Sequence, residues 1–451
     1  MGPPAAPAAD RRRARPDRGH RQPGHGHPSQ ARQGCLVITE TVDVAIVGGG
    51  IIGICAAFKL QEAGRTTLLI DRKGLAEETS RGNAGAFAFS DVIPMANSGV
   101  LQKLPKWLSD PLGPLTIRPE YLAQITPWMM RFWRAGWPDR VAASIRAQSA
   151  LMRVARSEAE SLITNAGLEH LIRRDGVLEL YESESELRGT AKDDAAKAAE
   201  GIEFRHVRGA ELAELQPGLS PKIVAGTFIP KWETVQDPYD YALAVAEAAT
   251  ARGASFRKAE VTQLRPQDDG VIIELSDGTA IRAKQVVVAG GAWSKRLTSP
   301  LGDDIPLETE RGYNTTLPGY SFDLKRQLFF GGHGFVVTPL ASGIRVGGAV
   351  ELGGLKLPPN FKRADAMLTK AARFMPGLAT TGGKQWMGFR PSLPDSLPAI
   401  GFSRRSRNIV YAFGHGHLGL TQSAGTGKLV ANLLTGAAQP IDMSPFSPQR
   451  F

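Results

Sequence analysis

The 451-residue sequence predicts an α/β fold in which two domains are interleaved along the chain. Three observations lead to this prediction. A strand, a glycine-rich turn, a helix and a second strand follow one another over residues 42–71. Strands and helices alternate again later, and a second glycine-rich turn precedes a final helix that we expect to end at Leu434. Blocks rich in β-hairpins separate these segments, and we assign the blocks to a second domain with a mixed sheet.

The first segment has the pattern of a dinucleotide-binding unit. Residues 42–47 form a short, apolar, β-branched run, which is typical of a buried parallel strand. Three glycines follow with the spacing G-x-G-x-x-G: Gly48, Gly50 and Gly53. The first allows a tight turn, and the second lets the backbone approach a pyrophosphate. The third lets the helix expected over 51–63 pack against the strand. The N-terminal N–H groups of that helix would face the phosphates.

The second strand, expected over 66–70, supplies the last feature of this Rossmann-like unit. Asp71 follows the strand, 23 residues after Gly48, where a carboxylate can bind a ribose hydroxyl. Because the strand, the turn, the helix, the second strand and the acidic residue all match the pattern of a dinucleotide-binding unit, we predict a dinucleotide site. A structural turn in an unrelated α/β domain is the alternative. The motif does not distinguish NAD from FAD, so that choice depends on the rest of the chain.

The remaining elements follow from local signals. Asp237 and Pro238 are an N-cap and first-turn pair, so they predict a helix that runs to Arg252. Asp277-Gly278 predicts a hairpin turn. Further strands are expected over 175–181, 254–264, 271–275, 285–289 and 408–413. Further helices are expected over 140–166 and 364–374, a hairpin over 335–350, and a proline-rich crossing segment over 386–401.

These elements give the expected domain boundaries. The nucleotide-binding domain takes residues 41–92, 236–300 and 390–451, and the second domain takes 93–235 and 301–389. Residues 1–40 are a tail. Half of the net charge of +10 lies in the first 34 residues, which are rich in arginine, proline and glycine and have no apolar periodicity. We expect this tail to be disordered, as an extension from an upstream start site. It lacks the amphipathic pattern of a transit peptide, and we expect no nucleic-acid partner.

Cysteine usage and hydropathy indicate a cytoplasmic protein. Cys35 and Cys55 are the two cysteines of the sequence, so there is neither a disulfide framework nor the spacing of a metal site. We therefore expect no metal and a reducing compartment. The sequence has no run of eighteen apolar residues, so we expect no transmembrane helix.

Large apolar side chains are concentrated over residues 101–137. Four of them share one face of a predicted helix by the i, i+1, i+4, i+5 pattern: Trp128, Met129, Phe132 and Trp133. We expect this face to pack in the core of the second domain. A peripheral contact with the membrane surface, or with another subunit, is the alternative.

Five landmarks in order along the chain resemble the D-amino acid oxidase family of flavoproteins. They are the unit over 48–71, Glu78-Thr79-Ser80 with Asn83-Ala84-Gly85, and the segments 286–293, 388–401 and 414–419. The Glu78-Thr79-Ser80 and 414–421 stretches are most similar to the D-amino acid dehydrogenase branch. This resemblance covers about 42–434, nearly the whole chain beyond the tail.

The resemblance implies FAD as the cofactor. Relatives that attach flavin covalently through cysteine use a late cysteine, and this chain has none after Cys55, so the FAD should be non-covalent. In the family pattern the motif glycines cradle the pyrophosphate, Asp71 binds the adenosine ribose, and Val261 lies at the adenine. Ser80 would contact the phosphates, with Gly85 and Ala86 near the isoalloxazine ring. The resemblance also places these residues at the cofactor: Ile51, Ile52, Arg72, Gly290, Gly416, His417, Leu418, Gly419, Leu420 and Thr421.

The same resemblance implies the substrate side of the site. In Gly388-Phe389-Arg390-Pro391, Arg390 would grip the α-carboxylate of an amino acid, because a guanidinium fork binds a carboxylate bidentately. A structural pairing of Arg390 with Asp395 is the alternative. Tyr313 would be a pocket tyrosine, and His415 would sense or stabilise charge on the flavin. A packed, neutral histidine is the other interpretation of His415.

Together these points imply an FAD-dependent D-amino acid dehydrogenase of amino acid catabolism. The substrate would be a D-amino acid, with cyclic ones such as D-proline or hydroxy-D-proline included. It would be converted to an imino acid and then a 2-oxo acid, and electrons would pass to a quinone or an electron-transfer protein. A glycine- or sarcosine-type amine oxidase is one alternative. A flavin-binding subunit of a larger dehydrogenase assembly is the other.

Overall fold

The computed structural model describes residues 1–2, 37–97, 99 and 113–451. The predicted tail lies mostly outside the described residues. Residues 37–40, which the sequence assigns to it, instead open the first strand, β1 (Val37–Val47). None of the helices in the described ranges is long and apolar enough to cross a membrane.

The nucleotide-binding domain is built on an eight-stranded sheet in the order β10-β2-β1-β13-β12-β11. β20 pairs with β13 in parallel, and β19 pairs with β20 antiparallel. The strands are β2 (Thr67–Asp71), β10 (Ser255–Lys258), β11 (Val261–Gln267), β12 (Gly270–Leu275), β13 (Thr279–Val288), β19 (Ala399–Phe402) and β20 (Ile409–Phe413). β1 lies between β2 and β13 and is parallel to both, as a βαβ unit requires.

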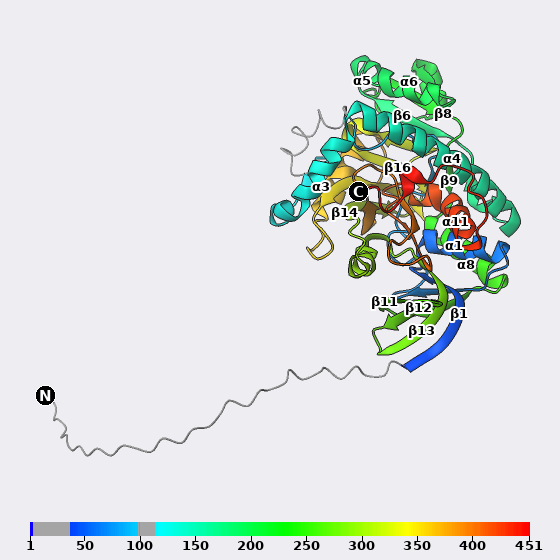
Figure 1. Cartoon of the computed structure of the whole chain (residues 1–451). Helices are drawn as coiled ribbons and strands as arrows, with labels where there is room; N and C mark the ends of the chain where they lie inside the picture. The colour runs from blue at the N-terminus through cyan, green and yellow to red at the C-terminus, as the bar shows by residue number, and fades with distance from the viewer. Residues whose placement is uncertain (3–36, 98, 100–112) are drawn as a thin grey trace, which may run out of the picture. The chain divides into compact units, whose positions relative to one another are not determined.

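Alternation along β1 separates the two faces of this sheet. Val44 and Ile46 pack toward a helical layer, whereas Ala45 and Val47 pack toward apolar residues of β11 and β12. The helices of that layer are α1 (Ile51–Glu62), α4 (Pro138–Ala166), α8 (Pro238–Ala251) and α11 (Gly419–Thr435), which Figure 1 shows side by side. The sequence assigns α4 to the second domain. In the structure, the apolar face of α4 packs against α11 of the nucleotide-binding domain.

The second domain is built on a nine-stranded mixed sheet in the order β18-β14-β17-β16-β15-β6-β8-β7, with β4 parallel to β17. Its strands are β4 (Leu115–Ile117), β6 (Val177–Tyr181), β7 (Arg205–Arg208), β8 (Ala225–Ile229), β14 (Glu308–Leu317), β15 (Gln327–Phe330), β16 (Phe335–Leu340), β17 (Gly343–Leu352) and β18 (Lys384–Ser392). α10 (Lys362–Phe374) packs on β17 and β14. A small third sheet joins β3 (Ala86–Phe87), β9 (Glu233–Val235) and β5 (Ile172–Arg173). The remaining α-helices described are α3 (Leu122–Ala135), α5 (Glu184–Gly189), α6 (Ala191–Ala199), α7 (Gly209–Leu215) and α9 (Lys295–Thr298).

Several predicted elements differ from the structure. The single strand expected over 254–264 is two strands, β10 and β11, which pair with different neighbours. Residues 279–288 form one continuous strand, because β13 pairs along its length with β1. The segment 386–401 contains β18 and the start of β19, so the second sheet extends to Ser392, past the predicted boundary at 390.

The predicted aromatic face of α3 is split. Trp128 and Phe132 are buried and stack on each other, with Met129 partly buried beside them. Trp133, in contrast, is 56% exposed and meets Trp137 edge to face. The split arises because the apolar residues span more of the helix circumference than the core can cover. Residues 100–112 of the aromatic stretch lie outside the described residues.

Candidate active site

The three motif glycines have different roles in the turn between β1 and α1. Gly48 has φ +121°, and a Cβ on it would lie 2.3 Å from the carbonyl oxygen of Ala289. A Cβ on Gly53 would lie 2.0 Å from the carbonyl oxygen of Gly48. Gly50 differs, because the nearest atom to its Cβ position is Ser80 Oγ at 3.3 Å. Gly48 and Gly53 therefore serve close packing of the backbone, while Gly50 borders open space.

That open space is a cavity of about 1190 Å³ between the two large sheets. It exceeds the roughly 300–1,000 Å³ of pockets for drug-sized ligands, so a dinucleotide and a small substrate fit in it together. Two predicted cofactor residues do not line it. Gly53 is packed under the turn, and Gly85 faces Leu340 and Val235. All the other predicted residues border it: Gly48, Gly50, Ile51, Ile52, Asp71, Arg72, Ser80, Ala86, Val261, Gly290, Tyr313, Arg390 and 415–421.

Ser80 organises the part of the cavity beside the N-terminus of α1. Its Oγ accepts a hydrogen bond from Ile51 N at 2.9 Å, so the first N–H of α1 is already used. The hydroxyl proton remains available to donate toward the cavity, which makes Ser80 the expected phosphate donor. Asp71 is also engaged, since it accepts from the backbone N–H groups of Gly49, Lys73 and Gly74 at 2.9, 2.8 and 3.3 Å. One lone-pair direction is left for a ribose hydroxyl.

A second part of the cavity is bordered by the N-terminus of α11. Residues 416–421 line the cavity there, and the helix begins at Gly419. Thr421 fixes the facing loop, because its hydroxyl accepts from Ala88 N at 3.0 Å and donates to Ala86 O at 3.1 Å. The positive end of the α11 dipole therefore stabilises negative charge in this part of the cavity.

Another part of the cavity wall is formed by facing positions of β14 and β18. The antiparallel register places Glu310 opposite Arg390, Gly312 opposite Gly388, and Asn314 opposite Trp386. All six residues border the cavity. A Cβ on Gly312 would lie 2.3 Å from Arg390 Nη2, and one on Gly388 would lie 1.9 Å from the Trp386 ring. The absence of side chains at Gly312 and Gly388 therefore leaves the space that the Arg390 guanidinium and the Trp386 indole ring occupy.

Arg390 is aimed by a bulge in β17. Its Nη1 donates to Ala349 O at 2.9 Å, and its Nη2 lies 3.4 Å from Gly348 O. Ala349 has φ +53°, a conformation that alanine rarely adopts, and it turns its carbonyl toward Arg390. The alternative partner is occupied elsewhere, because Asp395 is bound by Arg450 at 2.7 Å. Burial lowers the pKa of the Arg390 guanidinium, and the charge of Glu310 opposes that shift.

Gly312→Ala should therefore displace the Arg390 guanidinium while leaving the cofactor site intact. The methyl group would stand 2.3 Å from Nη2, so the guanidinium must move away from residue 312. We expect kcat/KM to fall roughly 10- to 100-fold, since about 1.4 kcal/mol is tenfold. Steady-state kinetics and the flavin spectrum check this. Gly189→Ala is the control, because no heavy atom lies within 4 Å of that Cβ position. Unchanged kinetics in Gly312→Ala would contradict the proposed placement.

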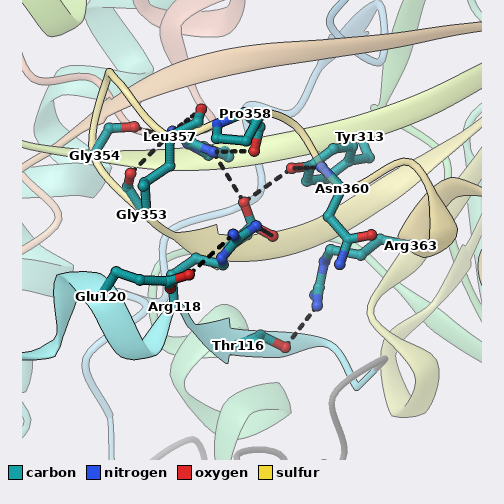
Figure 2. Close-up of polar contacts among 12 residues, drawn as sticks. Thr116, Arg118, Glu120, Tyr313, Gly353, Gly354, Leu357, Pro358, Asn360 and Arg363 are labelled. Carbon is teal, nitrogen blue, oxygen red and sulfur yellow. Dashed lines mark hydrogen bonds and ion pairs between the residues drawn. The ribbon is translucent and has the colours of Figure 1, made fainter. Parts of the chain in front are cut away.

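Tyr313 is not the pocket tyrosine that the sequence predicts. Although the residue borders the cavity, it is 1% exposed, and its hydroxyl donates to Glu351 Oε1 at 2.9 Å and accepts from Asn360 N at 3.0 Å. Figure 2 shows Tyr313 directed at Asn360. The reason is strand alternation: Gly312 takes the cavity face of β14, so Tyr313 and Arg311 take the other face.

That other face carries a buried structural cluster. Arg311 is fully buried and forms an ion pair with Glu351 at 3.1 Å. Its guanidinium also donates to four backbone carbonyls of the loop after β17, those of Gly353, Gly354, Leu357 and Pro358, which Figure 2 labels. Because every donor of this guanidinium is used, the cluster fixes the loop and has no donor left for a ligand.

The pKa values of the two histidines at the cavity are shifted in opposite directions. His415 is 3% exposed, and its Nε2 lies 2.9 Å from Thr426 Oγ1, while Nδ1 has no hydrogen-bond partner among the described residues. Burial lowers the pKa of His415 to about 3, so it is neutral near pH 7 and supplies no positive charge to a flavin. Burial also acts on His417, but Asp91 at 3.1 Å outweighs it and raises the pKa of His417.

The low pKa of His415 has a consequence for stability. Between about pH 6.5 and 3 the unfolded chain binds a proton at this position and the folded chain does not. Stability therefore falls as pH falls through this window, by up to about 1.4 kcal/mol per pH unit. We expect His415→Gln to show a shallower loss between about pH 6.5 and 5, measured as the free energy of unfolding in urea at fixed cofactor concentration. Parallel pH profiles would contradict a neutral buried His415.

Asp91, Glu310 and Trp386 are among the cavity residues that the sequence did not predict. Strand alternation offered a signal for two of them. If Arg390 faces the cavity, Trp386 faces it four residues earlier, and if Gly312 faces it, so does Glu310. Asp91 lies in a loop, and its ion pair with His417 joins positions 326 apart, for which local sequence gives no signal.

Comparison with known proteins agrees with this geometry. The profile of the FAD dependent oxidoreductase (DAO) family matches residues 43–433. A D-amino-acid oxidase of Bradyrhizobium diazoefficiens is 37% identical over 421 residues, which cover 90% of this chain and 98% of that protein. A D-amino acid dehydrogenase of Rhizobium rhizogenes is 30% identical over 415 residues, covering 90% and 99%. The crystal structure of glycine oxidase from Geobacillus kaustophilus superposes with a TM-score of 0.70 at 23% identity, covering 92% and 100%.

The similarity to the glycine oxidase structure confirms the predicted fold class. The family match covers most of the chain and confirms the predicted cofactor and the resemblance stated from the sequence. The cavity also meets the needs of that cofactor, because Gly50 is open to it, the Ser80 hydroxyl can donate a hydrogen bond, and the N-termini of α1 and α11 border it. The chain therefore belongs to the DAO family of FAD-dependent oxidoreductases, and FAD is its cofactor.

Proposed function

We propose that the chain oxidises D-amino acids and passes the electrons to a quinone or an electron-transfer protein. The observation that carries the substrate assignment is the Arg390 guanidinium. It lies over Gly312 in the cavity wall and forms no ion pair with a described residue. An α-carboxylate is the ligand that such a fork binds best. The two most similar relatives reported above are named for action on D-amino acids, which supports the stereochemical choice.

FAD would be held by residues along the cavity. Gly50 and Ser80 would meet the pyrophosphate, Asp71 the adenosine ribose, and Val261 the adenine. FAD, when bound, would supply the hydride-accepting chemistry for oxidation at the substrate Cα. The α11 N-terminus would stabilise the negative charge that follows, without a charged histidine. The cysteine in the described ranges, Cys55, is buried on α1 and does not border the cavity, which supports non-covalent binding.

The residues of the chain would contribute positioning. Arg390 binds the carboxylate, and its two backbone acceptors keep the guanidinium from swinging. The Trp386 ring lies beside it on the same wall, so the substrate is confined between this wall and the cofactor. The imino acid product leaves for water, where hydrolysis gives a 2-oxo acid and ammonia. Positioning of this kind accounts for a large part of many enzymatic rate enhancements.

A panel of D- and L-amino acids tests the proposal. The purified protein should reduce an artificial dye when D-amino acids are supplied. The panel should include D-proline and hydroxy-D-proline as cyclic substrates, and glycine and sarcosine as substrates of a glycine-type oxidase. Acid precipitation should release the flavin into the supernatant. Dye reduction should exceed peroxide formation. Equal rates would favour an oxidase, and bound FAD without turnover would favour a subunit of a larger assembly.

An exposed apolar patch on α3 and the turn after it supports a contact with the electron acceptor or its membrane. Met130 and Trp133 on α3 are 67% and 56% exposed, and Trp137, which follows the end of α3, is 42% exposed. Arg134 of α3 lies over the Trp137 ring, 4.5 Å from its centroid. Aromatic and basic side chains on one short helix are typical of interfacial binding. We expect the wild type to sediment with anionic vesicles, and the Met130→Ser, Trp133→Ser double variant to remain in the supernatant. Sedimentation of both would place the contact elsewhere.

A further inference from the structure

Glu310 on β14 is a buried carboxylate that the positioning scheme above does not use. It exposes 6% of its surface, and that surface borders the cavity. Its carboxylate has no hydrogen bond and no ion pair within 4.0 Å among the described residues. A buried carboxylate without a hydrogen-bond partner is costly to keep. Its retention in the cavity wall is explained if a cationic ligand group completes the site.

The position of Glu310 defines that ligand group. It lies opposite Arg390 in the β14–β18 register, and both residues border the same cavity. They do not pair with each other, because the guanidinium is held by the carbonyls of Ala349 and Gly348. The wall therefore presents a separate cation and anion on adjacent strands. An amino-acid zwitterion carries the complementary pair, with its carboxylate and ammonium on one carbon.

The other charged groups around Glu310 leave it available. His417, with its partner Asp91, acts on it from the loop before α11, and Glu308 acts on it from the same strand. Glu308 is used elsewhere, since it accepts from the Tyr121 hydroxyl at 2.8 Å and from Thr309 N at 2.7 Å. The neighbour of Glu310 on β17 is Leu352, which has no charge.

We propose that Glu310 binds the α-ammonium group of the substrate and accepts its proton before oxidation. This inference rests on the proposed function. The N–H bond breaks and its proton moves to a Glu310 oxygen, which leaves a lone pair on nitrogen. The Cα–H bond then breaks with its electron pair, which passes as hydride to FAD, and the nitrogen lone pair forms the C=N bond. The proton returns to water after the product leaves.

This role predicts selectivity as well as rate. A carboxylic acid that lacks the amine can still bind Arg390, but it brings a second negative charge near Glu310. The wall should therefore favour amino acids over their amine-free analogues. Glu310→Gln removes the charge and the base and keeps the shape, so it should weaken the binding of amino acids without weakening the binding of their amine-free analogues.

Two measurements on Glu310→Gln test the inference. At neutral pH kcat/KM for a D-amino acid should fall roughly 100-fold or more, as expected for loss of a general base. It should recover toward the wild-type value at alkaline pH, where the free amine is abundant. In anaerobic titrations followed by flavin absorbance, glycine should bind more weakly to the variant than to the wild type. Acetate should bind equally or more tightly.

Glu308→Gln is the matched control, because it removes a carboxylate from the same strand outside the cavity and keeps a hydrogen-bond acceptor for Tyr121. It should retain the wild-type pH profile. An unchanged pH profile in Glu310→Gln, or equal weakening of glycine and acetate, would overturn the inference. If the wild type turns over no amino acid but Glu310 still discriminates glycine from acetate, the proposed function fails and the binding role stands.

Discussion

Arg390→Ala should lower kcat/KM for D-amino acids by roughly thirty-fold to a few thousand-fold. Removing one partner of a buried, hydrogen-bonded charge pair costs roughly 2–5 kcal/mol, and about 1.4 kcal/mol corresponds to tenfold. Arg390→Lys should recover only part of this loss, because an ammonium keeps the charge without the fork. Steady-state kinetics measure the loss, and the flavin spectrum should change little, because we expect Arg390 to bind the substrate and not the cofactor.

Arg450→Ala is the matched control for this prediction. It removes a guanidinium that is bound to a carboxylate, Asp395, but outside the cavity. It should lower stability and leave kcat/KM near the wild-type value. If Arg390→Ala keeps near-normal kcat/KM, another group holds the carboxylate and the substrate assignment fails. A colourless Arg390→Ala variant would place the arginine at the cofactor instead.

Gly50→Val should give a folded protein that has lost its flavin. Gly50 has φ −76° and ψ 173°, an extended conformation that valine adopts without strain, and its Cβ position meets only Ser80 Oγ at 3.3 Å. The branched side chain would instead fill the space beside the α1 N-terminus where the pyrophosphate should lie. We expect no flavin absorbance after purification. Added FAD should raise the melting temperature of the wild type but not of the variant.

Gly53→Val provides the contrast that makes this result interpretable. Its Cβ would lie 2.0 Å from the carbonyl oxygen of Gly48, so β1 and α1 could not pack. We expect this variant to be insoluble or to unfold at a much lower denaturant concentration, as judged by circular dichroism. If Gly50→Val behaves in the same way, the two glycines share a structural role. Flavin retained by Gly50→Val would place the pyrophosphate elsewhere.

The local turn around Gly48 could be predicted from the sequence because short-range sterics decide it. The same is true of the start of α8, where Asp237 accepts from Tyr239 N at 2.9 Å as an N-cap. Apolar runs likewise predicted the buried strands, since burial on both faces leaves little choice of side chain. The resemblance to the D-amino acid oxidase family then identified the cofactor as FAD, because the glycine motif alone does not distinguish FAD from NAD.

The arrangement of the cavity wall formed by β14 and β18 depends on the tertiary structure. Gly312 lies under Arg390, 78 positions away in the sequence, through the register of β14 with β18. The bulge at Ala349 in β17 then sets the direction of the guanidinium. Because successive residues of a strand face opposite sides, a shift of one residue would have placed Tyr313 in the cavity and Glu310 outside it. The sequence determines which residues are available to the site, and only the pairing of distant strands determines which of them face it.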